Sequence, residues 1–290
     1  FPLSVGASVV LMSERPTPDA VFKRWTEQKP TVLFGAPTGF AGMLASPRLP
    51  PREAVALRMC SSAGEALPAE IGQRFSAHFG CEIIDGIGST EMLHIFISNR
   101  PGDVHYGTTG KVVPGYSIEL RGDDGRPVAD GEVGDLYIGG PSAALLYWAN
   151  RERTTATFQG PWTKSGDKYV RNADATYTYA GRSDDMLKVS GQYVSPFEVE
   201  ATLCQHASVL EAAVIGVADP EGLTRAKAFV VLKPGLASSA ALEEELKAFV
   251  KTRLAPFKYP RQIEFLAELP KTSTGKIQRF RLRELEAGKR

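Results

Sequence analysis

The sequence predicts an α/β protein in which a mainly parallel sheet is followed by a β-rich region and a small α+β module. Residues 1 to about 100 alternate strand-like and helix-like segments, an order typical of parallel sheets with crossover helices. From about 106 to 188 the segments become short strands and turns, and beyond Gly181 helices with capping residues return. With 290 residues and 43% hydrophobic content, the chain is long enough for about two domains.

The first predicted elements are a strand, a helix and a second strand. Residues 6–11 (GASVVL) are apolar and predict a buried strand. Thr17 then offers a helix cap, Pro18 suits the first helical position, and Pro30 ends the helix. Residues 31–34 (TVLF) are expected to form the next short buried strand.

A second helix and strand follow in the same order. Pro68 opens the helix, Gly80 ends it, and residues 81–84 (CEII) predict the next strand. Apolar side chains recur on one face of this helix at four-residue spacing, at Ile71, Phe75 and Phe79. This second alternation strengthens the prediction of a parallel sheet.

The β-rich region is predicted from its turns. Residues 122–125 (GDDG) follow a strand at 117–120, and residues 172–174 (NAD) separate short strands at 169–170 and 177–179. These short strands and turns predict a β-rich subdomain.

The last module begins with a capping box formed by Ser195 and Glu198. Apolar strands are expected at 212–217 and 228–232, followed by a helix at about 241–254. That helix has one apolar face, acids in its first turns and bases in its last.

Bulk composition restricts the function and the compartment. The net charge is +1, whereas nucleic-acid-binding proteins usually carry a concentrated basic excess, so no nucleic acid is expected as a partner. No apolar run approaches the ~18 residues of a membrane span, and we expect no membrane association. Three widely spaced cysteines, Cys60, Cys81 and Cys204, favour a reducing compartment, the cytoplasm. Because the chain begins at Phe1, we expect a fragment of a longer protein.

Two short motifs follow predicted strands, where open α/β sheets bind their ligands. Residues 62–68 (SAGEALP) lead from a strand into a helix, and residues 86–91 (GIGSTE) end the next strand. Each motif alone also fits an ordinary turn with a solvated Glu.

Two further motifs lie in the later part of the chain. Residues 162–167 (WTKSGD) end in Asp167, and residues 181–188 (GRSDDMLK) follow shortly after. Residues 270–277 (PKTSTGKI) differ from a Walker phosphate loop, because Lys276 precedes Ile and no earlier Gly stands at the required distance.

In their order and spacing these four motifs resemble the adenylate-forming superfamily of acyl-CoA synthetases, luciferases and peptide-synthetase adenylation domains. Residues 88–95 (GSTEMLHI) are similar to the benzoate–CoA ligases within it. The resemblance covers the whole chain and implies a truncated large adenylate-forming domain at 1–183. That domain would combine part of the parallel sheet with the β-rich subdomain, and a hinge and small mobile α+β domain would follow at 184–290.

The resemblance implies ATP-dependent activation of an aromatic carboxylate, benzoate in the first place. The carboxylate and MgATP give acyl-AMP and pyrophosphate, and the thiol of coenzyme A (CoA) then displaces AMP. The family's Ser/Thr/Gly-rich loop, which ends in Lys and holds the β- and γ-phosphates, is not found in these residues. We therefore expect residues 1–290 alone to be catalytically inactive.

The resemblance also assigns roles to single residues. Catalysis is implied for Thr90, Glu91 and Lys276, and Glu91 is the implied ligand of Mg²⁺. Lys276 would bridge the substrate carboxylate and the α-phosphate, as a compact ammonium can. Contacts to ATP or AMP are implied for Ala63, Gly64, Glu65, Asp85, Gly86, Thr90, Asp167 and Arg182.

Further residues are implied for the other substrates and for the motion between half-reactions. The implied aryl pocket consists of Ala63, Gly86, Gly88, Leu93 and His94. The implied CoA contacts are Ser190, Gly191, Arg225, Phe257 and Lys258. Asp184 is the implied hinge. His94 could alternatively have a structural role. Arg225, Phe257 and Lys258 could alternatively be surface residues, or a packed aromatic in the case of Phe257.

Several alternatives stay open on the sequence. An aryl-AMP ligase that loads a carrier protein would share the adenylation motifs, and a folded remnant without catalysis would share the fold. Benzoate, hydroxybenzoate and aminobenzoate are not separated by the residues above. The expected partners are small molecules, namely the aromatic carboxylate, ATP and CoA, and the expected assembly is a monomer or homodimer.

Overall fold

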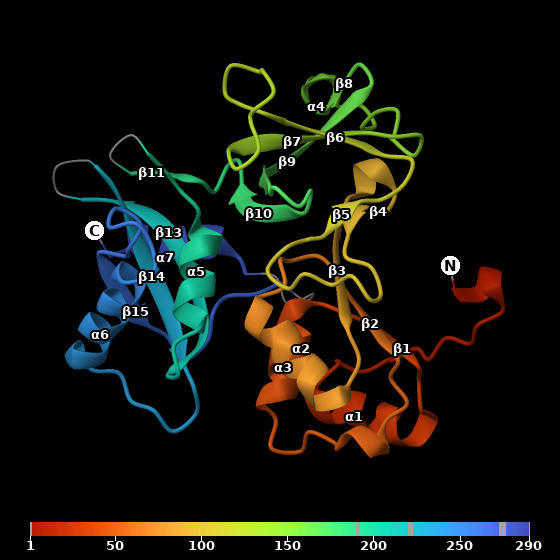
Figure 1. Cartoon of the computed structure of the whole chain (residues 1–290). Helices are drawn as coiled ribbons and strands as arrows, with labels where there is room; N and C mark the ends of the chain where they lie inside the picture. The colour runs from red at the N-terminus through yellow and green to blue at the C-terminus, as the bar shows by residue number, and fades with distance from the viewer. Residues whose placement is uncertain (1, 190–191, 220–222, 273–276, 290) are drawn as a thin grey trace. The chain divides into compact units, whose positions relative to one another are not determined.

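The computed structural model describes residues 2–189, 192–219, 223–272 and 277–289 (Figure 1). The chain divides into two compact units, one formed by Phe1–Gly88 and Ile97–Lys111, the other by Ser89–Phe96 and Val112–Arg290. Sheets and helices alternate as expected, so the α/β fold class is confirmed. The division into domains at residue 184 stays a prediction. No helix in the described ranges combines the length and the apolar character needed to cross a membrane.

The first sheet has five strands in the order β1-β2-β3-β4-β5. Their bounds are β1 (Val32–Gly35), β2 (Met59–Ser62), β3 (Ile83–Gly88), β4 (Ile95–Ser98) and β5 (Lys111–Val112). The pairs β1–β2 and β2–β3 are parallel, which confirms the sheet type predicted for this region. Because β2 and β3 are neighbours, the motifs that follow them emerge at the same edge of the sheet.

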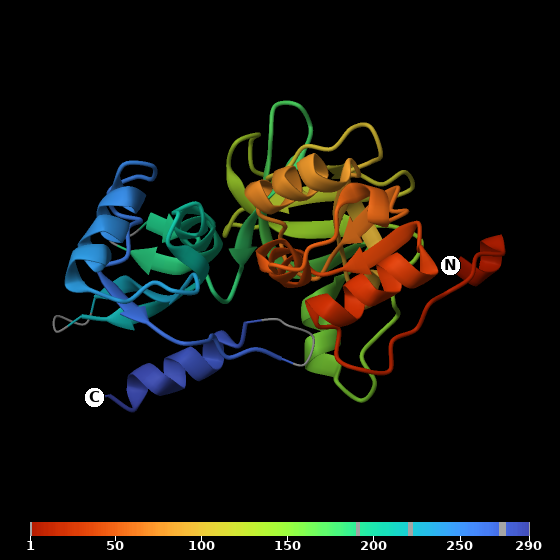
Figure 2. The same ribbon diagram turned by 90° about the horizontal axis from the view of Figure 1, so that it is seen from below.

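Figure 2 shows the helices of the first unit, of which α1 and α3 form where their end signals predict them. They are η1 (Pro2–Val5), α1 (Pro18–Gln28), α2 (Pro37–Ala45), η2 (Arg52–Ala54) and α3 (Ala69–Phe79). The Thr17 hydroxyl caps α1, and Gly80, with φ of 64°, ends α3. The three helices α1, α2 and α3 bury Trp25, Phe40 and Phe75 in one core. Burial of each such ring contributes roughly 1.5–3 kcal/mol or more.

The predicted strand at residues 6–11 is wrong. Residues 7–12 have no regular secondary structure, and the Leu11 side chain is 84% exposed. An apolar run becomes a strand only when another strand satisfies its backbone N–H and C=O groups. Among the described residues the first sheet has β1 at its margin, and nothing pairs residues 6–11 with it.

The second sheet is antiparallel and confirms the predicted β-rich region. Its order is β10-β9-β7-β6, with β8 paired to β9. The strands are β6 (Ser117–Arg121), β7 (Val133–Gly139), β8 (Phe158–Gln159), β9 (Trp162–Arg171) and β10 (Tyr177–Arg182). Two short helices accompany them, η3 (Thr90–Met92) and α4 (Arg151–Thr157).

The last part contains the hairpin of β11 (Leu187–Val189) and β12 (Gln192–Val194) and a sheet in the order β13-β14-β15. The sheet strands are β13 (Val209–Ala218), β14 (Thr224–Leu232) and β15 (Gln262–Phe265). The helices are α5 (Pro196–Cys204), α6 (Ala240–Lys251) and α7 (Arg279–Ala287). The Ser195 half of the predicted capping box is present, since the Ser195 hydroxyl accepts from the Glu198 N–H at 3.1 Å, whereas the Glu198 carboxylate pairs with Nζ of Lys258.

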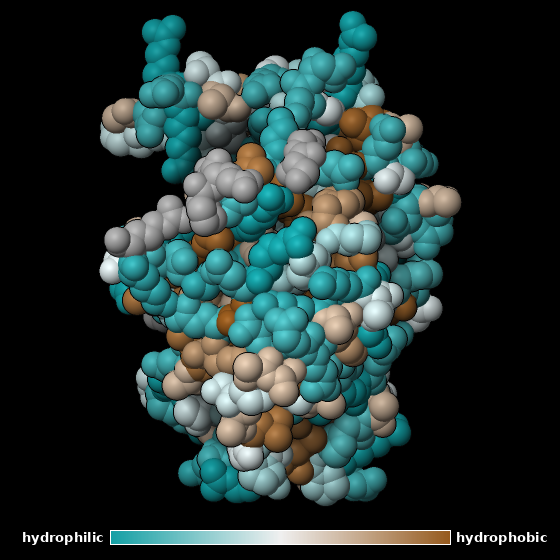
Figure 3. Space-filling model, turned by 90° about the vertical axis from the view of Figure 1, so that its left-hand side faces the viewer, coloured by the Kyte–Doolittle hydropathy of each residue, from teal (hydrophilic) through white to brown (hydrophobic). Residues whose placement is uncertain are grey.

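Alternating side chains of β13 separate two cores in this last part. Val214 packs in one cluster with Leu203 of α5 and Leu246 of α6. Ile215 packs in the other with Leu282 of α7. The sheet therefore has α5 and α6 on one face and α7 on the other, as the two-residue period of a strand allows. On the surface seen in Figure 3, hydrophilic residues predominate and the apolar ones form small separated groups.

Candidate active site

The loop after β2 carries the first motif. Gly64 has φ of 93°, a conformation that glycine adopts without strain. The Glu65 carboxylate accepts a hydrogen bond of 2.8 Å from the Thr38 hydroxyl. Ala63 and Glu65 are half-buried and Gly64 is exposed, so the loop presents its backbone at the surface. The adjoining strand β3 provides Gly86, which is buried, and Gly88, which is exposed.

Asp85 lies in β3 beside Ser62 of β2. Its side chain is only 4% exposed, and burial raises the pKa of Asp85 to about 7. The Ser62 hydroxyl and two backbone N–H groups partly offset this effect by favouring the ionised form. Oδ1 of Asp85 makes no hydrogen bond to any residue that the structure describes. A buried acceptor in this state is well suited to a donor group on a ligand.

Glu91 is held by contacts from the segment that precedes α4. The Tyr147 hydroxyl donates a hydrogen bond to Oε1 of Glu91, and the Ala144 N–H donates to its backbone oxygen at 2.8 Å. Burial opposes ionisation of Glu91, but hydrogen bonds from Tyr147, its own backbone N–H and Ser89, together with the charge of Arg153, outweigh it and lower its pKa. The carboxylate is therefore ionised at neutral pH, as a cation ligand must be.

Sequence reasoning missed Tyr147, which is separated from Glu91 by 56 residues of chain. The Tyr147 N–H donates to the Thr154 hydroxyl at 3.0 Å, and the guanidinium of Arg153 lies 4.3 Å from its ring centre. The Tyr147 ring also contacts that of Phe158, with centroids 5.6 Å apart. These contacts fix the direction of its hydroxyl, and no local pattern in the sequence indicates them.

The predicted aryl-pocket residues Leu93 and His94 lie in a tight turn after η3. Leu93 has φ of 69° and ψ of −48°, and the His94 N–H donates to the Met92 oxygen at 2.9 Å. These values describe a γ-turn, which is strained for a residue with a branched side chain. Thr90, Leu93 and His94 are exposed, and Met92 is fully buried.

Asp167 and Arg182 lie opposite each other on the paired strands β9 and β10. Nη1 of Arg182 is 3.2 Å from Oδ1 of Asp167, and the Ser165 hydroxyl accepts from the Asp167 N–H at 3.0 Å. Burial raises the pKa of Asp167, and the charge of Arg182 acts against this rise. Two motifs that are separate in the sequence thus form one charged pair.

A buried charge cluster stands next to this pair, and sequence reasoning missed it as well. Asp135 of β7 lies 2.9 Å from Nζ of Lys168 and 3.1 Å from Nζ of Lys164. The Ser183 hydroxyl donates to Oδ1 of Asp135 at 2.8 Å. Burial opposes ionisation of Asp135, but these hydrogen bonds and charges prevail and lower its pKa.

The predicted CoA contacts are distributed over the last part of the chain. Arg225 of β14 pairs with Asp219 at 2.9 Å, and Nζ of Lys258 lies 2.7 and 2.8 Å from the Glu198 oxygens. Phe257 packs against the core between β13, α5 and α6. The predicted CoA residues Ser190 and Gly191 and the predicted catalytic Lys276 lie outside the described residues.

Metal binding would depend on few protein ligands. Within the ranges that the structure covers, no three His, Cys, Asp or Glu residues gather closely enough to hold an ion. Mg²⁺ is nevertheless commonly bound through one or two carboxylates together with water and substrate phosphates. The ionised and oriented Glu91 fits that description.

Comparison with known proteins assigns the chain to a family. Residues 1–148 match the model of the AMP-binding enzyme family, and residues 198–276 match that of the AMP-binding enzyme C-terminal domain. The chain belongs to the AMP-binding enzymes. The family resemblance seen in the sequence motifs is thereby confirmed, while the roles of single residues stay predictions.

Within the AMP-binding enzymes, similar proteins act on aromatic acids according to their names. The chain is 60% identical to a benzoate–CoA ligase of Thauera aromatica over 98% of its length, and 51% identical to a 4-hydroxybenzoate–CoA/benzoate–CoA ligase of Rhodopseudomonas palustris over 99%. It spans 54% of each of these relatives, about half their length. A solved benzoate CoA ligase from Burkholderia xenovorans superposes with a TM-score of 0.93 at 67% identity, over 98% of this chain and 57% of that one.

Proposed function

We propose that the protein to which this chain belongs activates an aromatic carboxylate with ATP and transfers the acyl group to CoA. Benzoate is the proposed substrate. The observation that carries the proposal is the 60% identity to a benzoate–CoA ligase, which extends over nearly the whole chain. Asp167 and Arg182 support it, since a buried carboxylate and a guanidinium 3.2 Å apart suit the ribose and phosphate of a nucleotide.

The remaining roles are proposed on the same basis. Asp85, with the surrounding backbone of the first two motifs, would receive the adenine, because its buried Oδ1 accepts no other described hydrogen bond. Thr90 would contact phosphate, and Lys276 would bridge the carboxylate and the α-phosphate while negative charge accumulates there. The 184–290 module would rotate about Asp184 between the half-reactions. Cys60, Cys81 and Cys204 form no disulfide in the described part of the chain, which agrees with a proposed cytoplasmic location.

Glu91 is the proposed protein ligand of Mg²⁺, which neutralises phosphate charge when bound. The part played by the chain itself is to hold an ionised carboxylate in a fixed direction. Tyr147 does this through its hydroxyl, while its ring is held by Arg153 and Phe158.

Tyr147→Phe should therefore raise the Mg²⁺ concentration needed for half-maximal acyl-AMP formation in the full-length enzyme by about threefold to tenfold. One hydrogen bond to a charged group contributes about 1.5–3 kcal/mol, and water replaces part of it. The substitution keeps the ring and its packing. Pyrophosphate exchange is measured over a series of Mg²⁺ concentrations, beside Tyr177→Phe as the matched loss of a tyrosine hydroxyl elsewhere. An unchanged Mg²⁺ requirement would show that Tyr147 does not orient the metal ligand.

The function is tested by supplying the full-length protein with MgATP and separate acids. Benzoate is compared with hydroxybenzoates, 2-aminobenzoate and acetate, and AMP and thioester are measured with free CoA or with a phosphopantetheine-bearing carrier protein. We expect AMP release with benzoate and thioester formation with free CoA. Transfer only to the carrier protein would identify an aryl-AMP ligase instead. A preference for acetate would contradict an aryl pocket.

A further inference from the structure

The residue before Asp184 is anchored to the second sheet. The Ser183 N–H donates to the Gly166 oxygen at 2.9 Å, and the Ser183 hydroxyl donates to Asp135 at 2.8 Å. Asp135 is itself held by two lysines, of which Lys168 is almost fully buried. A side chain fixed by buried, charge-assisted hydrogen bonds has little freedom to move. Ser183 follows β10 directly and is therefore fastened to the second sheet by these two hydrogen bonds.

The residue after Asp184 is anchored to the last part of the chain. The Asp185 carboxylate accepts a hydrogen bond from Arg283 and lies 3.8 Å from Nη1 of Arg279. Nη2 of Arg279 in turn lies 2.8 and 2.7 Å from the two oxygens of Glu200. Oε1 of Glu200 also accepts from the Val214 N–H at 2.7 Å. Asp185 is thus linked to α7, α5 and β13 through one chain of ionic contacts.

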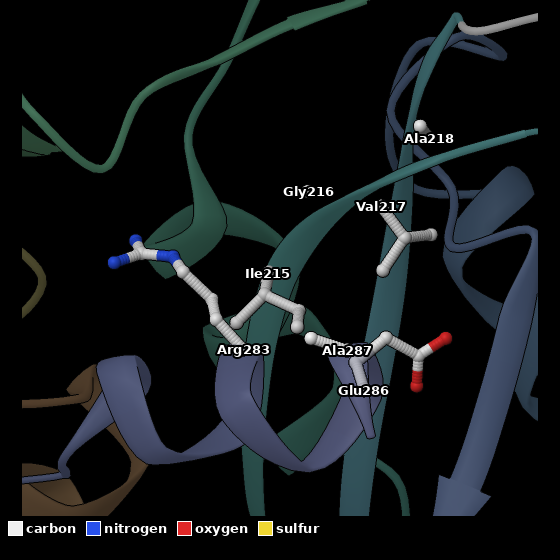
Figure 4. A pocket seen from close by; sticks show the side chains of 7 residues that line it. All are labelled: Ile215, Gly216, Val217, Ala218, Arg283, Glu286 and Ala287. Carbon is white, nitrogen blue, oxygen red and sulfur yellow. The ribbon is translucent and has the colours of Figure 1, made fainter. Parts of the chain in front are cut away.

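Helix α7 is well suited to transmit such a link. Figure 4 shows Arg283 and Glu286 extending to opposite sides of α7, beside a shallow pocket against β13. On one side Arg283 holds Asp185, and on the other Glu286 accepts from Nζ of Lys227 of β14 at 2.5 Å. The helix is fastened to the sheet independently of its contact with Asp185.

Asp184 differs from both neighbours. Its side chain is 78% exposed, whereas that of Asp185 is 18% exposed. Its one described ion pair joins Oδ1 of Asp184 to Nε of Arg182 at 3.5 Å. Both side chains are exposed to solvent, and an exposed ion pair restricts the backbone little. The N–H groups of Asp185 and Met186 both donate to the Arg182 oxygen, at 3.1 and 3.0 Å. These two bonds span Asp184, and a change in its φ or ψ would have to break them.

We propose that Asp135 and Asp185 are positioning residues that confine the rotation of the 184–290 module to the backbone of Asp184. The inference rests on the proposed function, in which the module works in two orientations. A pivot of one residue has only two soft torsion angles. If Ser183 or Asp185 loses its anchoring contacts, its backbone torsion angles become free to change as well. The module then samples more orientations and spends less time in each of the two orientations that the reaction needs.

The test measures the spread of orientations directly. Spin labels are placed at the exposed positions Ala129 and Ala241, each changed to Cys, in a Cys204→Ser background that leaves Cys60 and Cys81 buried. The distribution of label-to-label distances is then recorded by pulsed electron spin resonance. We expect Asp185→Asn to make this distribution about twofold wider than that of the parent chain.

Asp184→Asn is the matched control, because it makes the same chemical change one residue earlier, at an exposed side chain, and should leave the width unchanged. Arg283→Gln removes the same contact from α7 and should reproduce the effect if Asp185→Asn fails to fold. The proposal would be overturned if Asp185→Asn and Arg283→Gln both left the width of the distance distribution unchanged. It would also be overturned if Asp184→Asn widened the distribution as much as they do. The distances need no substrate, so absence of ligase activity would refute the proposed function without deciding this test.

In the full-length enzyme the proposal predicts that loss of the Asp185 contact changes kcat but not KM for ATP. Asp185→Asn should lower kcat for acyl-AMP formation about threefold to tenfold while KM for ATP stays the same, because the nucleotide site is intact. A merely structural defect would lower the active fraction instead, which titration of bound acyl-AMP detects. A higher KM for ATP with normal kcat would contradict the positioning role.

Discussion

Lys276→Ala in the full-length enzyme is expected to slow acyl-AMP formation on the order of a hundredfold, with much less effect on thioester formation from supplied acyl-AMP. The first half-reaction brings a carboxylate to a phosphate, and a well-placed cation relieves that repulsion in the transition state. Loss of such a charge costs about 3 kcal/mol or more. The two half-reactions are measured separately, by pyrophosphate exchange and by CoA consumption with synthetic benzoyl-AMP.

The control for this substitution is Lys251→Ala. Lys251 belongs to the same module but is an exposed residue of α6 and has no proposed role in the reaction. It should leave both half-reactions within about twofold of the parent enzyme. Equal losses in both half-reactions for Lys276→Ala would contradict a role confined to adenylation.

Asp85→Asn is expected to stabilise the first unit of this chain at pH 8 by up to about 4 kcal/mol and to have little effect near pH 4. Burial raises the pKa of Asp85 from 3.8 to about 7, so the folded form holds its proton more firmly than the unfolded one. Stability from this group is complete below pH 3.8 and is lost as the pH rises towards 7. Asparagine keeps the shape and removes the charge.

Urea denaturation between pH 4 and 8 measures this effect. Trp25 is fully buried in the first unit and reports its unfolding once Trp148 and Trp162 are changed to Phe. Glu53→Gln, an exposed acid of the same unit, serves as control and should show no comparable pH dependence. A parent chain whose first unit is equally stable at pH 5 and pH 8 would show that Asp85 is not buried as described.

Elements with local signals were predicted well from the sequence. Thr17, Gly80 and Ser195 act on helix ends only a few residues away, and their roles are confirmed. The apolar run at 6–11 failed as a strand because strand formation depends on a partner, which is not a property of the run itself. Local chemistry thus predicts where elements begin and end better than it predicts pairing.

The candidate site shows the same division. Asp167 and Arg182 stand in recognisable motifs, and the strands that carry them are paired. Tyr147 and Asp135 carry no motif, and their contacts cross 56 and 48 residues of chain. Such contacts arise only when the chain folds. A single sequence therefore indicated the groups proposed to touch substrate but not those that orient them.

The contact between Glu200 and the Val214 N–H also affects whether the edge of the last sheet can pair with a second molecule. In the described sheet, β13 is an outer strand, and the free N–H and C=O groups of such a strand can template pairing with a second molecule. Glu200 occupies one of these donors from the side and brings the guanidinium of Arg279 against the same edge. A bulky ion pair in this position obstructs an incoming strand, so the contact opposes aggregation through β13.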